Sequence, residues 1–300
     1  MTGAHASRLP RARETPLANV ARRVRYRQLT SCVKWFASLR WQTASETLAL
    51  QSEKFMQIKT EFVMIGTMRT FIAAPFAEAK FPGILIYSDI FQLGTSLLSF
   101  CKRLASYGFV VAAPEIFHRH EAAGVVLEQN DEGRARGARN ALATTIEEFD
   151  LDAQTVIEFL QNHSAVEPEN IGAGGFCIGG HLAFRAALNP NVKGAACFYP
   201  TWLSNGKLGK GEQANSLERA SEIKGELLII FGLQDQYIPE EARTQIINAL
   251  NEAKVKTSIE LFNADHGFMR DDRPAYDGEC EDLAFAAVLE HFDKVFEGEV

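Results

Sequence analysis

The chain has 300 residues, of which 46% are hydrophobic, and carries a formal net charge of −7 at pH 7. This length and composition are sufficient for a sizeable core, and a single domain of about 240 residues lies within the usual range for enzyme folds. No run of 18 apolar residues occurs, so the sequence supports no membrane span.

Charge is distributed unevenly along the chain. Residues 1–55 carry ten basic and three acidic side chains, a net of +7, which leaves −14 on residues 56–300. An acidic body argues against nucleic acid as a partner. We therefore divide the chain into a basic extension, residues 1–55, and one α/β domain, residues 56–300.

The basic extension has two interpretations. Its arginine-rich, acid-poor composition is similar to that of an organellar transit peptide. Alternatively, translation starts at Met56, directly before the first strand-like segment, and the protein is cytoplasmic; we favour this second interpretation. In either case we expect residues 1–55 to be disordered or weakly helical and to carry no catalysis. The sequence contains five cysteines and no CxxC pair, which favours a reducing compartment.

Strand-like and helix-like segments alternate from Met56 onward, which predicts a mainly parallel sheet with helices on both faces. In the first half we expect a strand pair at 57–65 and 68–74, a buried strand at 83–88, a helix at 96–107 and a strand at 108–114. One long helix follows, carrying Leu142, Ile146, Phe149, Ala153, Val156 and Leu160. In the second half we expect a strand and helix around position 177, strands at 194–199, 226–232 and 257–262, and a final helix carrying Cys280 to Val295.

The segment GAGGFCIGGH at 172–181 places Cys177 between a buried strand and a helix. This is the pattern of a nucleophile elbow, with sulfur in place of the usual serine oxygen. The strained turn needs small neighbours, which Gly175 and Gly179 supply. The helix that follows directs its N-terminus at the sulfur and favours a thiolate there.

Two further strands end in side chains that match this nucleophile. The strand 226–232 continues into LQDQYIP, which places Asp235 just after it, and the strand 257–262 continues into NADHGF, which contains His266. The order of nucleophile, acid and histidine is that of the α/β-hydrolase fold. Alternatively, Asp235 forms a turn or caps a helix, and His266 is a loop histidine without a catalytic role.

The motifs FCIGG, GLQDQYIP and ADHGFMR together resemble those of the dienelactone hydrolase (carboxymethylenebutenolidase) family. The resemblance extends from about Met56 to the C-terminus. It implies an α/β-hydrolase fold, opening of small esters or lactones by a triad of Cys177, Asp235 and His266, and no metal or organic cofactor. It leaves monomer and homodimer both open.

The resemblance also assigns three charged residues. Asp89, in YSDIF at 87–91, occupies a position where well-studied members carry glutamate next to the thiol, and it would receive the thiol proton. Arg270 and Arg134 match positions that bind a substrate carboxylate, a task for which a planar guanidinium is suited. The aromatic residues that follow the second arginine in lactone-specific members are not evident after Arg134. A structural pairing of Asp89 is the alternative to a proton relay.

The chemistry requires these residue types. A free thiol is only a few per cent thiolate at neutral pH, so Cys177 needs a base, and His266 held by Asp235 can serve. Attack on a carbonyl places negative charge on its oxygen, and we expect the backbone amides of Ile178 and Ile90 to bind it.

Other functions remain possible on the same residues. A thioesterase or general carboxylesterase would use the same triad on another substrate. A redox sensor would use an activated Cys177 without ester turnover. A non-catalytic binding protein would keep only the fold. His118, His120, Glu121 and Glu115 resemble a metal cluster, but a solvent-facing loop explains them better. The polar segment 202–216 is expected to border the site entrance as a mobile loop.

Overall fold

The computed structural model describes residues 56–212 and 214–297. The expectations for the basic extension, including its boundary at residue 55, fall on residues outside this range. The order of elements along the chain confirms the predicted alternation of strands and helices.

The described residues form one sheet in the spatial order β1-β2-β4-β3-β5-β6-β7-β8. The pairs β1–β2 and β2–β4 are antiparallel, and every other pair is parallel. The strands are β1 (Ile58–Ile65), β2 (Met68–Pro75), β3 (Phe81–Tyr87), β4 (Val110–Pro114), β5 (Val166–Phe176), β6 (Val192–Phe198), β7 (Glu226–Gly232) and β8 (Lys256–Phe262). The sheet is thus mainly parallel, as predicted.

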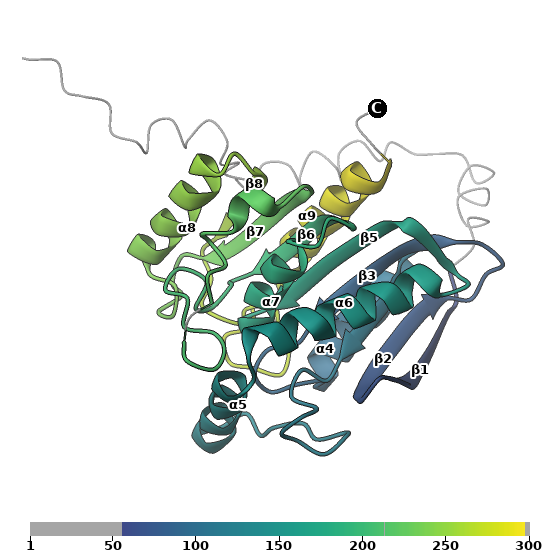
Figure 1. Ribbon diagram of the computed structural model, residues 1–300, viewed down its shortest axis with the longest axis horizontal. Helices are drawn as coiled ribbons and strands as arrows, with labels where there is room; N and C mark the ends of the chain where they lie inside the picture. The colour runs from purple at the N-terminus through teal and green to yellow at the C-terminus, as the bar shows by residue number, and fades with distance from the viewer. Residues whose placement is uncertain (1–55, 213, 298–300) are drawn as a thin grey trace, which may run out of the picture.

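Helices cover both faces of the sheet. Helices α6 and α7 lie on one face and α4 and α9 on the other (Figure 1). The helices are α4 (Thr95–Ser106), α5 (Asp131–Ala143), α6 (Ile146–Asn162), α7 (Ile178–Ala186), α8 (Glu240–Glu252) and α9 (Gly278–Glu297), with a 3₁₀ turn η1 at Ala220–Glu222. Parallel strands need both faces covered because their residues are apolar on both sides.

The single long helix predicted around residues 142–160 is wrong in one respect. Leu142 belongs to α5, and α6 starts only at Ile146. The break is local chemistry: the Thr145 side chain accepts from the Glu148 amide, and the Glu148 carboxylate accepts from the Thr145 amide. This capping box satisfies two backbone donors that a helix start leaves unpaired, so the chain begins a new helix there.

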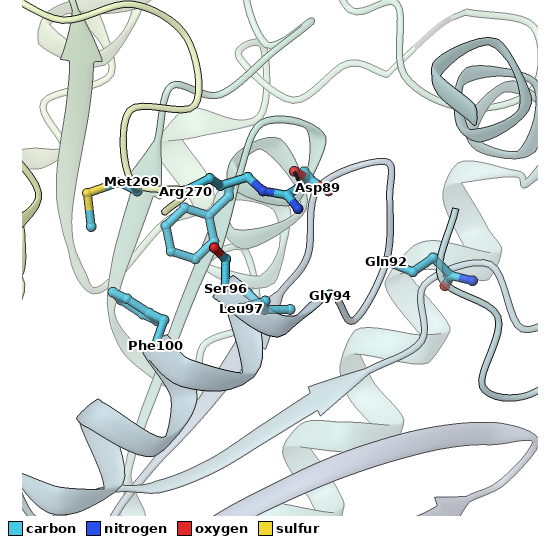
Figure 2. A pocket seen from close by; sticks show the side chains of 9 residues that line it. Asp89, Gln92, Gly94, Ser96, Leu97, Phe100, Met269 and Arg270 are labelled. Atoms are coloured by element: carbon cyan, nitrogen blue, oxygen red, sulfur yellow. Dashed lines mark hydrogen bonds and ion pairs between the residues drawn. The ribbon is translucent and has the colours of Figure 1, made fainter. Parts of the chain in front are cut away.

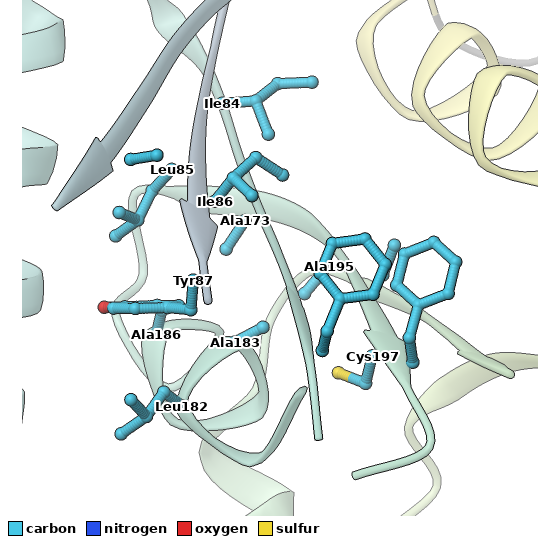
Figure 3. Close-up of a cluster of buried hydrophobic side chains, with 14 of the residues drawn as sticks. Ile84, Leu85, Ile86, Tyr87, Ala173, Leu182, Ala183, Ala186, Ala195 and Cys197 are labelled. Carbon is cyan, nitrogen blue, oxygen red and sulfur yellow. The ribbon is translucent and has the colours of Figure 1, made fainter. Parts of the chain in front are cut away.

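The core is centred on β3, β5 and β6. Ile84, Leu85 and Ile86 on β3 are fully buried, and Figure 3 shows them beside Ala173 of the adjacent strand β5, with Ala195 of β6 beyond it. Burying a side chain of this size contributes about 1.5 to 3 kcal/mol. The central strands are therefore the rigid base from which the loops at their carboxyl ends project.

One glycine on β5 and one on α7 allow close packing around this base. A Cβ at Gly172 would come within 2.7 Å of the Phe292 ring on α9, and one at Gly179 would lie 2.2 Å from the carbonyl oxygen of Ser88. The first contact allows α9 to lie against the sheet. The second brings α7 against the chain that leaves β3, and both segments carry predicted site residues.

We expect Gly179→Ala to destabilise the protein by about 3 kcal/mol, because its methyl group would overlap backbone that cannot move independently. Gly211→Ala is the matched control, since a Cβ there meets nothing within 4 Å and only its φ of +86° opposes the change, at a cost of about 1 kcal/mol. Urea unfolding of both variants gives the comparison. Equal losses would show that the approach of α7 to Ser88 is not tight.

Candidate active site

Cys177 lies at the turn between β5 and α7, as the sequence predicts. Its φ is 60° and its ψ −121°, a conformation that a residue with a Cβ rarely adopts. The turn is held by a hydrogen bond from the Cys177 amide to the Phe198 carbonyl, at 3.1 Å. A Cβ at Gly175 would lie 2.2 Å from the Gly179 carbonyl oxygen, which explains the small residues on either side. The thiol is thereby presented at the carboxyl end of the sheet.

Asp235 and His266 meet at the ends of β7 and β8. The Asp235 Oδ2 lies 2.7 Å from His266 Nδ1. The second carboxylate oxygen, Oδ1, accepts from the Tyr237 amide at 2.8 Å and the Ile238 amide at 3.3 Å. Asp235 therefore both forms the turn considered from sequence and holds the imidazole, because Oδ1 accepts from the backbone and Oδ2 contacts His266.

The environment of His266 sets its protonation state. Burial lowers the pKa of His266, but the charge of Cys177 and the hydrogen bonds with Asp235 and Cys177 outweigh it and raise the pKa to about 10. The rings of Tyr199 and Tyr237 each lie with their centroids 4.8 Å from the imidazole. These interactions favour the protonated form of the His266 ring over the neutral form.

Two backbone amides at the cavity have no hydrogen-bond acceptor in the part of the chain that the structure describes. The Ile178 amide opens α7 and has no partner within the helix. Neither it nor the Ile90 amide donates to another described residue. Both residues line the same cavity as Cys177.

A cavity of about 180 Å³ contains the thiol and the imidazole. Its walls are mainly apolar and aromatic, with two guanidinium groups. The lining residues are Asp89, Ile90, Phe91, Arg134, Ala138, Cys177, Ile178, Tyr199, Thr201, Trp202, Tyr237, His266, Gly267 and Arg273. Trp202 brings the start of segment 202–216 to the site, as expected, while Leu203 and Leu208 are buried.

Asp89 lies at the site but is already paired. Its Oδ2 accepts from the Arg270 guanidinium, and its Oδ1 accepts from the Phe91 amide at 2.8 Å. Figure 2 shows the Arg270 side chain directed at Asp89, and both residues line a small cavity that shares Asp89 with the cavity lined by the thiol. Arg270 also bonds to Asp272, at 2.9 and 2.8 Å. In this state the Arg270 guanidinium serves two carboxylates of the chain itself.

The other predicted arginine and one unpredicted arginine line the main cavity. Arg134, on α5, is half-exposed and pairs with Asp131. Arg273 was not singled out from sequence, yet its guanidinium lies 4.6 Å from the Phe91 ring centroid, and its Nε donates to Gln129. Its spacing from His266 does not distinguish it from Arg270. Only the turn after His266 determines which arginine faces the cavity.

Among residues 56–212 and 214–297, the other histidines and cysteines lie outside the site. His118 bonds to Thr67 and Asp152, and no group of three or more potential metal ligands occurs within residues 56–212 and 214–297. His181 is fully buried, which lowers its pKa to about 3, and bonds to Ser216. Cys101 and Cys197 are core residues whose thiol pKa is raised by burial. The four cysteines in the described part of the chain are unpaired.

The sheet order, the elbow and the sequence of nucleophile, acid and histidine define a protein of the α/β-hydrolase class. The crystal structure of a "putative dienelactone hydrolase" from Klebsiella pneumoniae has the same fold, with a TM-score of 0.70 and 22% identity over 79% of this chain and 99% of that one.

The family follows from the sequence comparisons. The model of the dienelactone hydrolase family matches residues 68–296, and the chain belongs to this family. A "putative carboxymethylenebutenolidase" of Saccharomyces cerevisiae is 32% identical over 82% of this chain and 92% of its own length. A protein of Synechocystis with the same name is 31% identical over 79% and 97%. The chain is thus a hydrolase of the family that acts on ester and lactone bonds. No helix in the described ranges is both long and apolar enough to span a membrane.

We expect Cys177→Ala to lower the pKa of His266 from about 10 by about 1 to 3 pH units, because the sulfur supplies the largest of the effects that raise it. NMR titration of the His266 ring protons measures this. Cys280→Ala is the control, since that thiol lies outside the cavity. An unchanged titration in Cys177→Ala would contradict a charged contact between sulfur and imidazole.

Arg270 forms a buried ion pair and Arg273 does not, so replacing them should change the free energy of unfolding by different amounts. Arg270→Gln leaves Asp89 without its charged partner in a buried setting and should cost about 3 kcal/mol of unfolding free energy. Arg273→Gln should cost less than about 1 kcal/mol, because no ion pair is broken. Thermal or urea unfolding tests this. The reverse order would mean that the Asp89–Arg270 pair does not hold the structure.

Proposed function

We propose that the protein is a cysteine-dependent hydrolase of small carboxylic esters or lactones that works through a thioester intermediate. The observation that carries the proposal is that Cys177 and His266 line one mainly apolar cavity, while Asp235 Oδ2 lies 2.7 Å from His266 Nδ1. Family membership supports the class of reaction, and the cavity size suits a small substrate.

In the first half of the reaction, the Cys177 thiolate attacks the carbonyl carbon. The carbonyl electrons move to oxygen, where the amides of Ile178 and Ile90 bind the charge, each donor being worth about 3 kcal/mol in comparable sites. When the carbon–oxygen bond breaks, the His266 imidazolium gives its proton to the leaving oxygen. For a lactone, this opens the ring and leaves the acyl chain on sulfur.

In the second half, neutral His266 takes a proton from water, and the resulting hydroxide attacks the thioester. The thiolate leaves as the carbon–sulfur bond breaks, and the carboxylic product departs. Asp235 stabilises the imidazolium at both stages. Thiolate and imidazolium are restored together, so no external oxidant or metal takes part.

Asp89 and the arginines would adjust the site to an acidic substrate. We expect Arg134 and Arg273, which line the cavity, to bind a substrate carboxylate, and we expect that carboxylate to compete with Asp89 for Arg270. Release from Arg270 would leave Asp89 free to accept the proton of any neutral thiol, which is the relay implied by the family. While the ion pair is intact, His266 alone holds the proton.

The test is turnover of p-nitrophenyl acetate and of a dienelactone by the full chain and by Cys177→Ala. We expect kcat/KM to fall by about 10³-fold or more in the variant, because the nucleophile is lost. Cys280→Ala should retain full activity, since its thiol lies away from the cavity. An active Cys177→Ala protein would overturn the proposal.

Turnover assays with further substrates distinguish this proposal from the alternative functions. Ester turnover without lactone turnover would indicate a general carboxylesterase, and a panel of acyl thioesters would identify a thioesterase. Reversible oxidation of Cys177 with no turnover of any of these would indicate redox sensing. Binding of esters without turnover in the wild-type protein would indicate a non-catalytic role.

A further inference from the structure

The hydroxyl of Thr201 is the side-chain oxygen hydrogen-bonded to the sulfur of Cys177. Thr201 Oγ1 lies 3.4 Å from Cys177 Sγ, a normal hydrogen-bond length for sulfur. The Thr201 amide also donates to the Cys177 carbonyl oxygen at 3.1 Å. Thr201 is only 6% exposed and lines the cavity. Backbone and side chain of Thr201 thus both contact the nucleophile.

The segment that carries Thr201 is held in an unusual conformation. Tyr199 has a φ of 36° and Trp202 a φ of 63°, both in the left-handed region that residues with side chains seldom occupy. The Tyr199 amide donates to the Ile230 carbonyl at 2.7 Å, which ties the start of the segment to β7. Such conformations cost energy and persist only where surrounding contacts fix them. The position of the Thr201 hydroxyl is therefore set by the fold.

The hydroxyl has two possible partners for its one proton. Its oxygen is 3.4 Å from the Tyr199 carbonyl oxygen, to which it can donate while accepting from a neutral thiol. A thiolate can only accept. When Cys177 is charged, the hydroxyl must turn its proton to sulfur, and it gives up only a long bond to the Tyr199 carbonyl.

We propose that Thr201 is a positioning residue for Cys177, whose hydroxyl donates to the thiolate and holds the sulfur in place for attack. The proposal deepens the proposed function, because it rests on Cys177 being the nucleophile. As the carbon–sulfur bond forms, the sulfur loses its charge and the hydroxyl turns back to the Tyr199 carbonyl. The Thr201 hydroxyl therefore changes its hydrogen-bond acceptor when the charge on sulfur changes, and it transfers no proton.

The test compares Thr201→Val, which keeps the shape and lacks the hydroxyl, with Thr201→Ser, which keeps the hydroxyl. The rate of Cys177 alkylation by iodoacetamide is measured from pH 4 to pH 9 in the full chain, with the labelled peptide quantified by mass spectrometry. We expect the acidic limb of the profile to move up by about one pH unit in Thr201→Val, since the thiolate loses a hydrogen bond. Below that limb the rate should fall about tenfold.

The serine variant should keep the wild-type profile. For p-nitrophenyl acetate, kcat of Thr201→Val should fall while KM changes less than about twofold, because substrate binding is not the interaction removed. If Thr201→Val does not fold, Thr201→Ala is used in its place, with the same expectation.

Three results would overturn the proposal: a profile in Thr201→Val identical to wild type, an equal shift in Thr201→Ser, or a rise in KM alone. If the proposed function itself is wrong, the experiments give a different result. In that case Cys177→Ala remains active on esters, whereas the alkylation profiles of the Thr201 variants still report whether the hydroxyl contacts the sulfur.

Discussion

The candidate active site depends on the backbone at Cys177, which has a φ of 60° at the junction of β5 and α7. Directly after this turn α7 approaches the end of β3 closely, with glycine at position 179 against the Ser88 carbonyl. The approach places the sulfur, the Ile178 amide and the Ile90 amide around one cavity. Strain at one residue is thus offset by the packing of the central strands beneath it.

Electrostatics then determine what this geometry can do. Asp235 is fixed by two backbone amides and presents its free oxygen to His266, while burial keeps water from screening the pair. The raised pKa of His266, about 10, favours the protonated ring in a cavity that the Cys177 thiol also lines. The neighbouring pair of Asp89 and Arg270 holds opposite charges close to the same cavity and keeps them neutralised.

The sequence was sufficient for the features that local patterns determine. Alternating segments predicted the mainly parallel sheet, and GGFCIGG predicted the turn at Cys177, because strand periodicity and glycine requirements act over a few residues. The break between α5 and α6 was missed because the helical spacing of Leu142 and Ile146 continues across it, while the cap at Thr145 interrupts the backbone. Thr201 and Arg273 were missed for another reason. Their places in the site depend on turns after β6 and β8 whose conformation no short motif encodes.

The most direct test of Cys177 as the nucleophile is to identify the residue that carries the acyl group during turnover. The full chain is mixed with p-nitrophenyl trimethylacetate, whose bulky acyl group slows hydrolysis of the intermediate, and is quenched in acid within the first turnovers. Peptide mass spectrometry then locates the acyl group. The account predicts one trimethylacetyl group on Cys177, released on further incubation at the rate of steady-state turnover. An acyl group on any other residue, with Cys177 unmodified during turnover, would contradict it.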